Sequence, residues 1–102
     1  MKITIQFFDG CPHWKLAEQR LLHAMSDLAR EDVEITYQRV DSPEDAERLA
    51  FHGSPTFLVG GRDVFARREM DVNFGCRVYE TEEGTQGVPS VAQLRHVLRS
   101  AS

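Results

Sequence analysis

Apolar and polar positions follow two different periodicities in the first forty residues. Over residues 2–8 apolar side chains fall on alternate positions, and Asp9-Gly10 follows, which predicts a strand that ends in a turn. Over residues 14–30 leucine, methionine and alanine recur every three to four positions, which predicts an amphipathic helix. Alternation returns over residues 33–40 and predicts a second strand, joined to the first by a right-handed crossover.

The rest of the chain has clear start and stop signals. Ser42 and Pro43 are typical of a helix start, and we expect that helix to run to about residue 51. Residues 56–59 and 76–81 read as strands, and Ser90 begins a final helix with Gln93 placed to complete a capping box. The expected order in the single domain, residues 1–102, is β-α-β-α-β-β-α.

Composition and net charge argue against some classes of partner. Hydrophobic residues make up 41% and charged residues 27% of the chain, as in ordinary globular domains. The net charge of −4 argues against a nucleic-acid partner, and no apolar run approaches the length of a membrane span. The first residues alternate like a strand and do not resemble an export signal, so we expect a cytoplasmic protein. In that reducing compartment Cys11 and Cys76 are expected to be thiols.

Cys11 lies where a reactive thiol is favoured. It directly precedes the first predicted helix, whose unpaired N–H groups and positive dipole end favour the thiolate, the nucleophilic form. Pro12 and a protonated His13 are candidates to tune it, whereas Trp14 is expected to pack over the sheet or shield the sulfur. The alternative is that Cys11 is a structural thiol.

The element order, with a cysteine after the first strand and a proline before the third, resembles the thioredoxin-fold superfamily over nearly the whole chain. In detail, FxGCPxW, GSPT, GGRD and CRVY are similar to a group of small bacterial thioredoxin-like proteins, some labelled organomercurial lyases. The resemblance implies an α/β, thioredoxin-like fold, with a mixed four-stranded sheet and helices on both faces. It also implies that Pro55 is the family's cis-proline and Cys11 its nucleophile.

By the same resemblance the chain is a thiol–disulfide oxidoreductase in which Ser54, Pro55 and Thr56 bind the substrate. The backbone of Ser54 would be free to pair with an extended peptide or with glutathione, the expected co-substrate. Trp14 stands where the family has its resolving cysteine, so the resemblance predicts a monothiol enzyme that forms mixed disulfides with glutathione or protein thiols.

Cys76 is the other candidate for a resolving thiol. If it begins the last strand of the sheet, it lies on the order of 10–15 Å from Cys11, too far for a direct disulfide. The long segment between residues 62 and 75 leaves that distance open. The alternative is a small buried hydrophobe, the usual fate of a lone thiol.

Two other functions stay open. One is a binding or redox-sensor module that keeps the scaffold without turnover. The other is a soft-metal or organomercurial thiol protein, although no cysteine or histidine pair has metal-ligand spacing and we predict no metal site. His52, just before Gly53, is placed where it could face Cys11.

Overall fold

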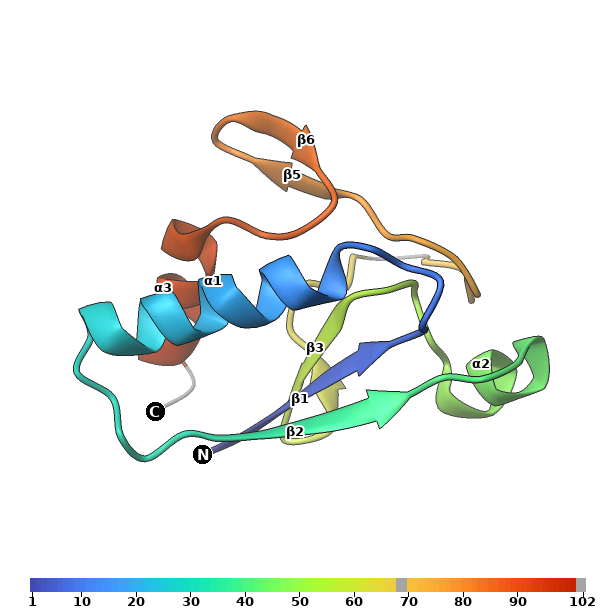
Figure 1. Cartoon of the computed structure of the whole chain (residues 1–102), viewed down its shortest axis with the longest axis horizontal. Helices are drawn as coiled ribbons and strands as arrows, with labels where there is room; N and C mark the ends of the chain where they lie inside the picture. Colours follow the sequence, from blue (N-terminus) through green and yellow to red (C-terminus); the bar gives the residue numbers. More distant parts are fainter. Residues whose placement is uncertain (68–69, 101–102) are drawn as a thin grey trace.

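A computed structural model of the chain describes residues 1–67 and 70–100. Three helices and two β-sheets make up an α/β fold (Figure 1). In chain order the elements are β1 (Lys2–Phe7), α1 (Trp14–Asp27), β2 (Glu34–Arg39), α2 (Pro43–Leu49), β3 (Thr56–Val59), β4 (Arg62–Asp63), β5 (Tyr79–Thr81), β6 (Gly84–Gln86) and α3 (Val91–Ser100). Within these described ranges no helix has the length and apolar character needed to cross a membrane.

The main sheet is mixed and has the strand order β2-β1-β3-β4. β1 runs parallel to β2 and antiparallel to β3, so that Ile5 stands opposite Tyr37 on one side and Phe57 on the other. Because successive side chains of a strand point to opposite faces, Ile3 and Ile5 lie on the same face of the sheet. This face carries the main core.

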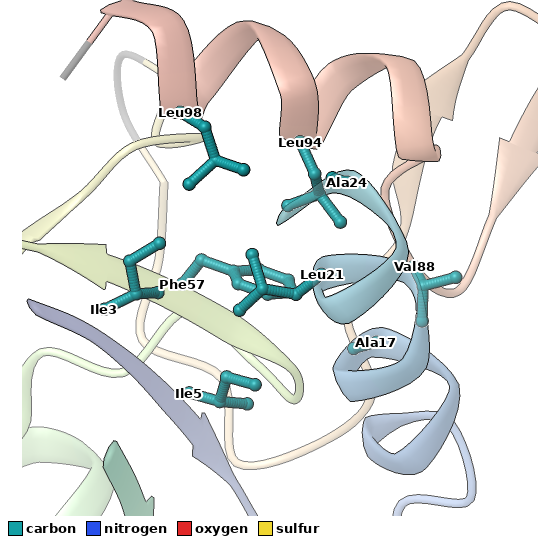
Figure 2. Close-up of a cluster of buried hydrophobic side chains, with 9 residues drawn as sticks. All are labelled: Ile3, Ile5, Ala17, Leu21, Ala24, Phe57, Val88, Leu94 and Leu98. Atoms are coloured by element: carbon teal, nitrogen blue, oxygen red, sulfur yellow. The ribbon is translucent and has the colours of Figure 1, made fainter. Parts of the chain in front are cut away.

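Helices α1 and α3 pack together over that face (Figure 2). Leu21 of α1 and Leu98 of α3 are completely buried and meet Phe57 of β3. Burial of a side chain of this size stabilises the fold by about 1.5–3 kcal/mol, so the helical stripe read from the sequence is what holds α1 in place. A smaller cluster of Val40, Ala46 and Phe51 anchors α2.

Both predicted serine caps are confirmed. Ser42 Oγ accepts a hydrogen bond from the backbone N–H of Asp45 at 3.0 Å. Ser90 and Gln93 form the reciprocal capping box, since each side chain accepts from the other residue's N–H. The start of α1 at Trp14 is also as predicted, but α1 ends at Asp27 instead of residue 30.

The prediction of the fourth strand was wrong. Residues 76–81 do not form the last strand of the main sheet; the fourth strand is β4, which follows β3 after the two-residue turn Gly60-Gly61. Both glycines have positive φ, 60° and 79°, the conformation that a tight hairpin turn requires and side chains disfavour. β4 is two residues long, too short for a periodicity. Tyr79–Thr81 instead pairs with β6 in a separate hairpin.

Candidate functional site: two thiols in contact

Cys11 lies in the turn between β1 and α1. Its backbone N–H donates to the carbonyl of Phe8 at 3.1 Å, and α1 begins three residues later at Trp14 with His13 as its N-cap. Cys11 is therefore two residues before the N-cap, and the prediction that it lies directly before the helix was wrong; the printed contacts of its sulfur are with the Ser54 carbonyl and Cys76 Sγ. Its residue is buried, with 2% of its surface exposed.

The loop before β3 lies against Cys11. The Ser54–Pro55 peptide bond is cis, as the resemblance implies. The Ser54 carbonyl oxygen is 3.4 Å from Cys11 Sγ and accepts a hydrogen bond from that thiol. Ser54 also fixes the end of β1, because its Oγ accepts from the Phe8 N–H at 3.3 Å.

The backbone of Ser54 is already paired with the chain itself. Its N–H donates to the carbonyl of Gly75 at 2.8 Å, and its carbonyl accepts from the N–H of Arg77 at 3.0 Å. These two bonds form a parallel bridge between Ser54 and Cys76. The expectation that Ser54 offers a free edge to a substrate peptide is thus not met, because residues 73–77, here called the strap, occupy that edge.

The strap brings the second thiol to the first. Cys76 Sγ lies 3.5 Å from Cys11 Sγ and donates a hydrogen bond to it. The predicted separation on the order of 10–15 Å is wrong, since Cys76 runs beside Ser54 and does not begin a strand of the main sheet. Both cysteines are free thiols, and Cys76 is exposed, so it is not the small buried hydrophobe of the alternative reading.

Hydrogen bonds at the first residue of the strap fix its course. The Asn73 N–H donates to the carbonyl of Phe51 at 2.8 Å, and Asn73 Nδ2 donates to the carbonyl of Cys76 at 3.1 Å. Gly53 makes room for the strap, since a Cβ built there would lie 2.9 Å from Arg77 Cβ. Its φ of +110° is a second reason for glycine at this position.

Arg77, directly after Cys76, anchors the strap from inside the protein. Its side chain is 4% exposed, and its guanidinium lies 2.8 Å from the carboxylate of Asp63 on β4. It also donates to Thr56 Oγ1 at 3.1 Å and to the carbonyl of Phe65 at 2.9 Å. His52 Nδ1 approaches the same carboxylate oxygen at 2.7 Å. His52 therefore belongs to this buried charge network, and the structure does not show it facing Cys11.

The surroundings of the site raise the pKa of some of its groups and lower that of another. Partial desolvation, the hydrogen bond to Cys11 Sγ and negative charge on Cys11 raise the pKa of the Cys76 thiol. Burial by itself raises the pKa of Asp63, but hydrogen bonds from Arg77 and His52 outweigh burial and lower it below its ordinary value. Burial also raises the pKa of Tyr79, whose hydroxyl donates to the carbonyl of Pro55. Asp63 is thus held as a carboxylate beside Arg77.

The other residues expected after Cys11 do not gather around its sulfur. Pro12 is exposed. The ring of His13 lies against Gly87, where an added Cβ would come within 2.8 Å of it. Trp14 stacks on Phe7 with ring centroids 4.3 Å apart, which fits the predicted role in packing over the sheet. Of the four, Cys11 is the residue whose side chain bonds to Ser54 and Cys76.

Thr56 is buried and binds within its own loop. Its hydroxyl donates to the carbonyl of Gly53 at 2.6 Å while it accepts from Arg77. Together with Ser54 and Pro55 it supports the strap, and in this structure the three residues contact their own chain where a substrate was expected. Ser54 and Thr56 bond to the strap at Gly75 and Arg77, and the Pro55 carbonyl accepts from Tyr79.

The exposed side of the thiol pair borders a pocket of about 430 Å³. Its described lining consists of His52, Arg67, Met70, Asp71, Asn73, Cys76, Arg77 and Val78. Cys76 lines this pocket, whereas the buried Cys11 is not among its described lining residues. Across residues 1–67 and 70–100, no group of three or more His, Cys, Asp or Glu side chains is arranged to hold a metal ion.

Sequence reasoning missed the strap, the Asp63–Arg77 pair and the contact between the thiols. A signal for the pair existed in part: Arg77 lies within a segment that otherwise reads as a strand, and Asp63 follows the Gly60-Gly61 turn closely. No protein-family model matches the chain, and neither a curated protein nor a solved structure does so.

Proposed function

We propose that the chain is a thiol–disulfide exchange protein whose redox couple is Cys11 and Cys76. The observation that carries the proposal is the 3.5 Å contact between the two sulfur atoms. A disulfide requires the sulfurs to approach to about 2.05 Å, and two thiols in contact need little backbone movement to do so. The couple replaces the single-thiol mechanism expected from the sequence, because Cys76 supplies the resolving thiol that position 14 lacks.

The exchange transfers two electrons from the two protein thiols to the substrate disulfide. One cysteine thiolate attacks a substrate disulfide R–S–S–R, forms a mixed disulfide and releases the first R–S⁻, which takes up a proton. The second cysteine attacks the protein sulfur of the mixed disulfide and releases the second R–S⁻. Cys11 and Cys76 end as a disulfide and the substrate as two thiols; two molecules of a second thiol such as glutathione then reduce the protein disulfide and leave as their own disulfide.

The proposal includes a thioredoxin-like fold. The strand order β2-β1-β3-β4, the parallel β1–α1–β2 unit and the cis peptide bond before Pro55 support it. Cys11 stands between β1 and α1, where that superfamily has its nucleophile. The separate hairpin of β5 and β6, together with the strap that precedes it, is this chain's addition to the expected order.

The test is the product of oxidation. Fully reduced protein is incubated with oxidised glutathione, and the mass of the intact chain is measured after remaining thiols are alkylated. We expect wild type to lose both thiols without retaining glutathione, and Cys11→Ser to stop as a glutathione adduct at the exposed Cys76. A wild type that stops as an adduct with one thiol free contradicts the couple. Oxidation without steady-state reduction of a small disulfide would favour a redox sensor over an enzyme.

A further inference from the structure

We infer that Cys76 is the thiol that attacks the substrate, and that Cys11 then resolves the mixed disulfide. This assignment rests on the proposed function and reverses the roles expected from the sequence. It follows from three features of the site: the unequal exposure of the two sulfurs, the occupied edge of Ser54, and the direction of the hydrogen bonds between the thiols.

The two sulfurs differ first in how easily a substrate can reach them. Attack on a disulfide requires the attacking sulfur to reach the substrate, and rates of exchange depend on that access. Cys11 is 2% exposed, whereas Cys76 is exposed and borders the 430 Å³ pocket. A substrate therefore meets Cys76 first, while Cys11 is reached from solvent after the strap moves.

The second feature is that the backbone of Ser54 is already hydrogen-bonded to the strap. An extended peptide would pair with the N–H and carbonyl of Ser54, and both already bond to Gly75 and Arg77 at 2.8 and 3.0 Å. The strap is itself held at Arg77 by the buried carboxylate of Asp63. The geometry thus favours a small disulfide entering the pocket beside Cys76 over a peptide laid across Ser54.

The third feature is the direction of the hydrogen bonds made by the two thiols. Cys76 donates to Cys11 Sγ at 3.5 Å, and Cys11 is placed to donate onward to the Ser54 carbonyl at 3.4 Å. The bond between the thiols holds the sulfurs in contact, so that Cys11 is in place to attack Cys76 Sγ once the mixed disulfide has formed. Partial desolvation, the bond to Cys11 Sγ and negative charge on Cys11 raise the pKa of Cys76, and a thiol of raised pKa is a stronger nucleophile once deprotonated.

The atoms balance through both steps. Cys76 loses its proton to water and attacks R–S–S–R as the thiolate, while Cys11 is a thiol, and the S–S bond of the substrate breaks. The released R–S⁻ takes the proton from Cys11 and leaves as R–SH. Cys11 then attacks Cys76 Sγ, expels the second R–S⁻, which takes a proton from water, and completes the protein disulfide.

The experiment is a competition within one folded molecule. Reduced wild-type protein receives less than one equivalent of iodoacetamide, and peptide mass spectrometry locates the alkylated cysteine. We expect Cys76 to be modified about tenfold or more in excess over Cys11, and the two to react alike in denaturant, where burial is lost. Preferential modification of Cys11 in the folded protein would overturn the assignment.

Removal of Cys11 tests whether Cys76 reacts while in contact with it. The rate of the first reaction of Cys76 with oxidised glutathione is measured against pH in wild type and in Cys11→Ser, both checked for folding by circular dichroism. Because the bond to Cys11 Sγ and negative charge on Cys11 contribute to the raised pKa of Cys76, we expect the Cys11→Ser profile to shift to lower pH. Superimposable profiles would contradict first attack by a Cys76 thiol in contact with Cys11. If wild type reacts first at Cys76 but never closes the Cys11–Cys76 disulfide, the proposed function fails; if it closes the disulfide after reacting first at Cys11, this assignment alone fails.

Discussion

Replacing Asp63 with alanine should test what holds the strap in place. Asp63 is 9% exposed and Arg77 4%, so the substitution leaves a guanidinium buried without its counter-charge. Its 2.7 Å contact with His52 and its 3.0 Å bond from the Phe65 N–H are lost as well. Removal of one partner from a buried ion pair destabilises a protein by about 3–5 kcal/mol, and we expect Asp63→Ala to fall in that range.

Asp27→Ala is the matched control. It removes a 2.7 Å pair with Arg95 whose side chains are 32% and 33% exposed, and such a pair contributes about 1 kcal/mol or less. Urea unfolding of wild type and both variants gives the free energy of unfolding from the midpoint and slope. If the two aspartate variants lose similar free energy, the Asp63–Arg77 pair does not hold the strap and the reasoning from burial is refuted.

Three further substitutions or conditions probe the site and the fold. The lowered pKa of Asp63 means that its contribution to stability is present above the unfolded value of about 3.9 and is lost as the pH falls below it. Asp63→Asn should therefore lose less stability than wild type between pH 7 and pH 3, and equal losses in urea unfolding would contradict this sign. Ser42→Ala should lower the free energy of unfolding by about 1 kcal/mol through loss of the 3.0 Å cap bond to Asp45, whereas Ser42→Gly should lower it by a few tenths. Gly53→Ala should displace the strap and increase alkylation of Cys11, because its φ is +110° and its Cβ would meet Arg77 Cβ at 2.9 Å. Gly60→Ala, with a φ of +60° but no neighbour within 4 Å, should leave that alkylation unchanged, and a similar increase in both variants would count against displacement of the strap.

The parts of the fold set by local chemistry could be predicted from the sequence. The cap at Ser42, the capping box at Ser90 and the start of α1 at Trp14 depend on residues within four positions of one another. The apolar positions that alternate in β1 and those of the helical stripe in α1 likewise contribute side chains to one core cluster. These signals were enough to place Cys11 before a helix, whereas the expectation that Pro55 lies beside it came from the family resemblance.

The second half of the site depends on contacts between distant segments. Ser54 bonds to Gly75 and Arg77, more than twenty residues away, and nothing local specifies that pairing. The usual expectation for arginine is exposure, yet Arg77 is buried because Asp63 neutralises it. The position of Cys76 follows from these two facts, so a reading based on spacing and periodicity placed it in the wrong strand.

Delivery of the second thiol by a distant strap has a thermodynamic consequence that a pair within one helical turn would lack. Cys11 and Cys76 are 65 positions apart, and in the chain-entropy model a crosslink closing a loop of that length stabilises the folded state by about 4 kcal/mol. Linkage makes the effect reciprocal: whatever stability the disulfide adds to the fold, the fold adds to formation of the disulfide. A contact that holds the strap therefore favours the disulfide over the two thiols even where it touches neither sulfur. The bonds of Asn73 and the pair between Asp63 and Arg77 are such contacts. On this argument the buried ion pair at Arg77 sets how readily the proposed couple is oxidised.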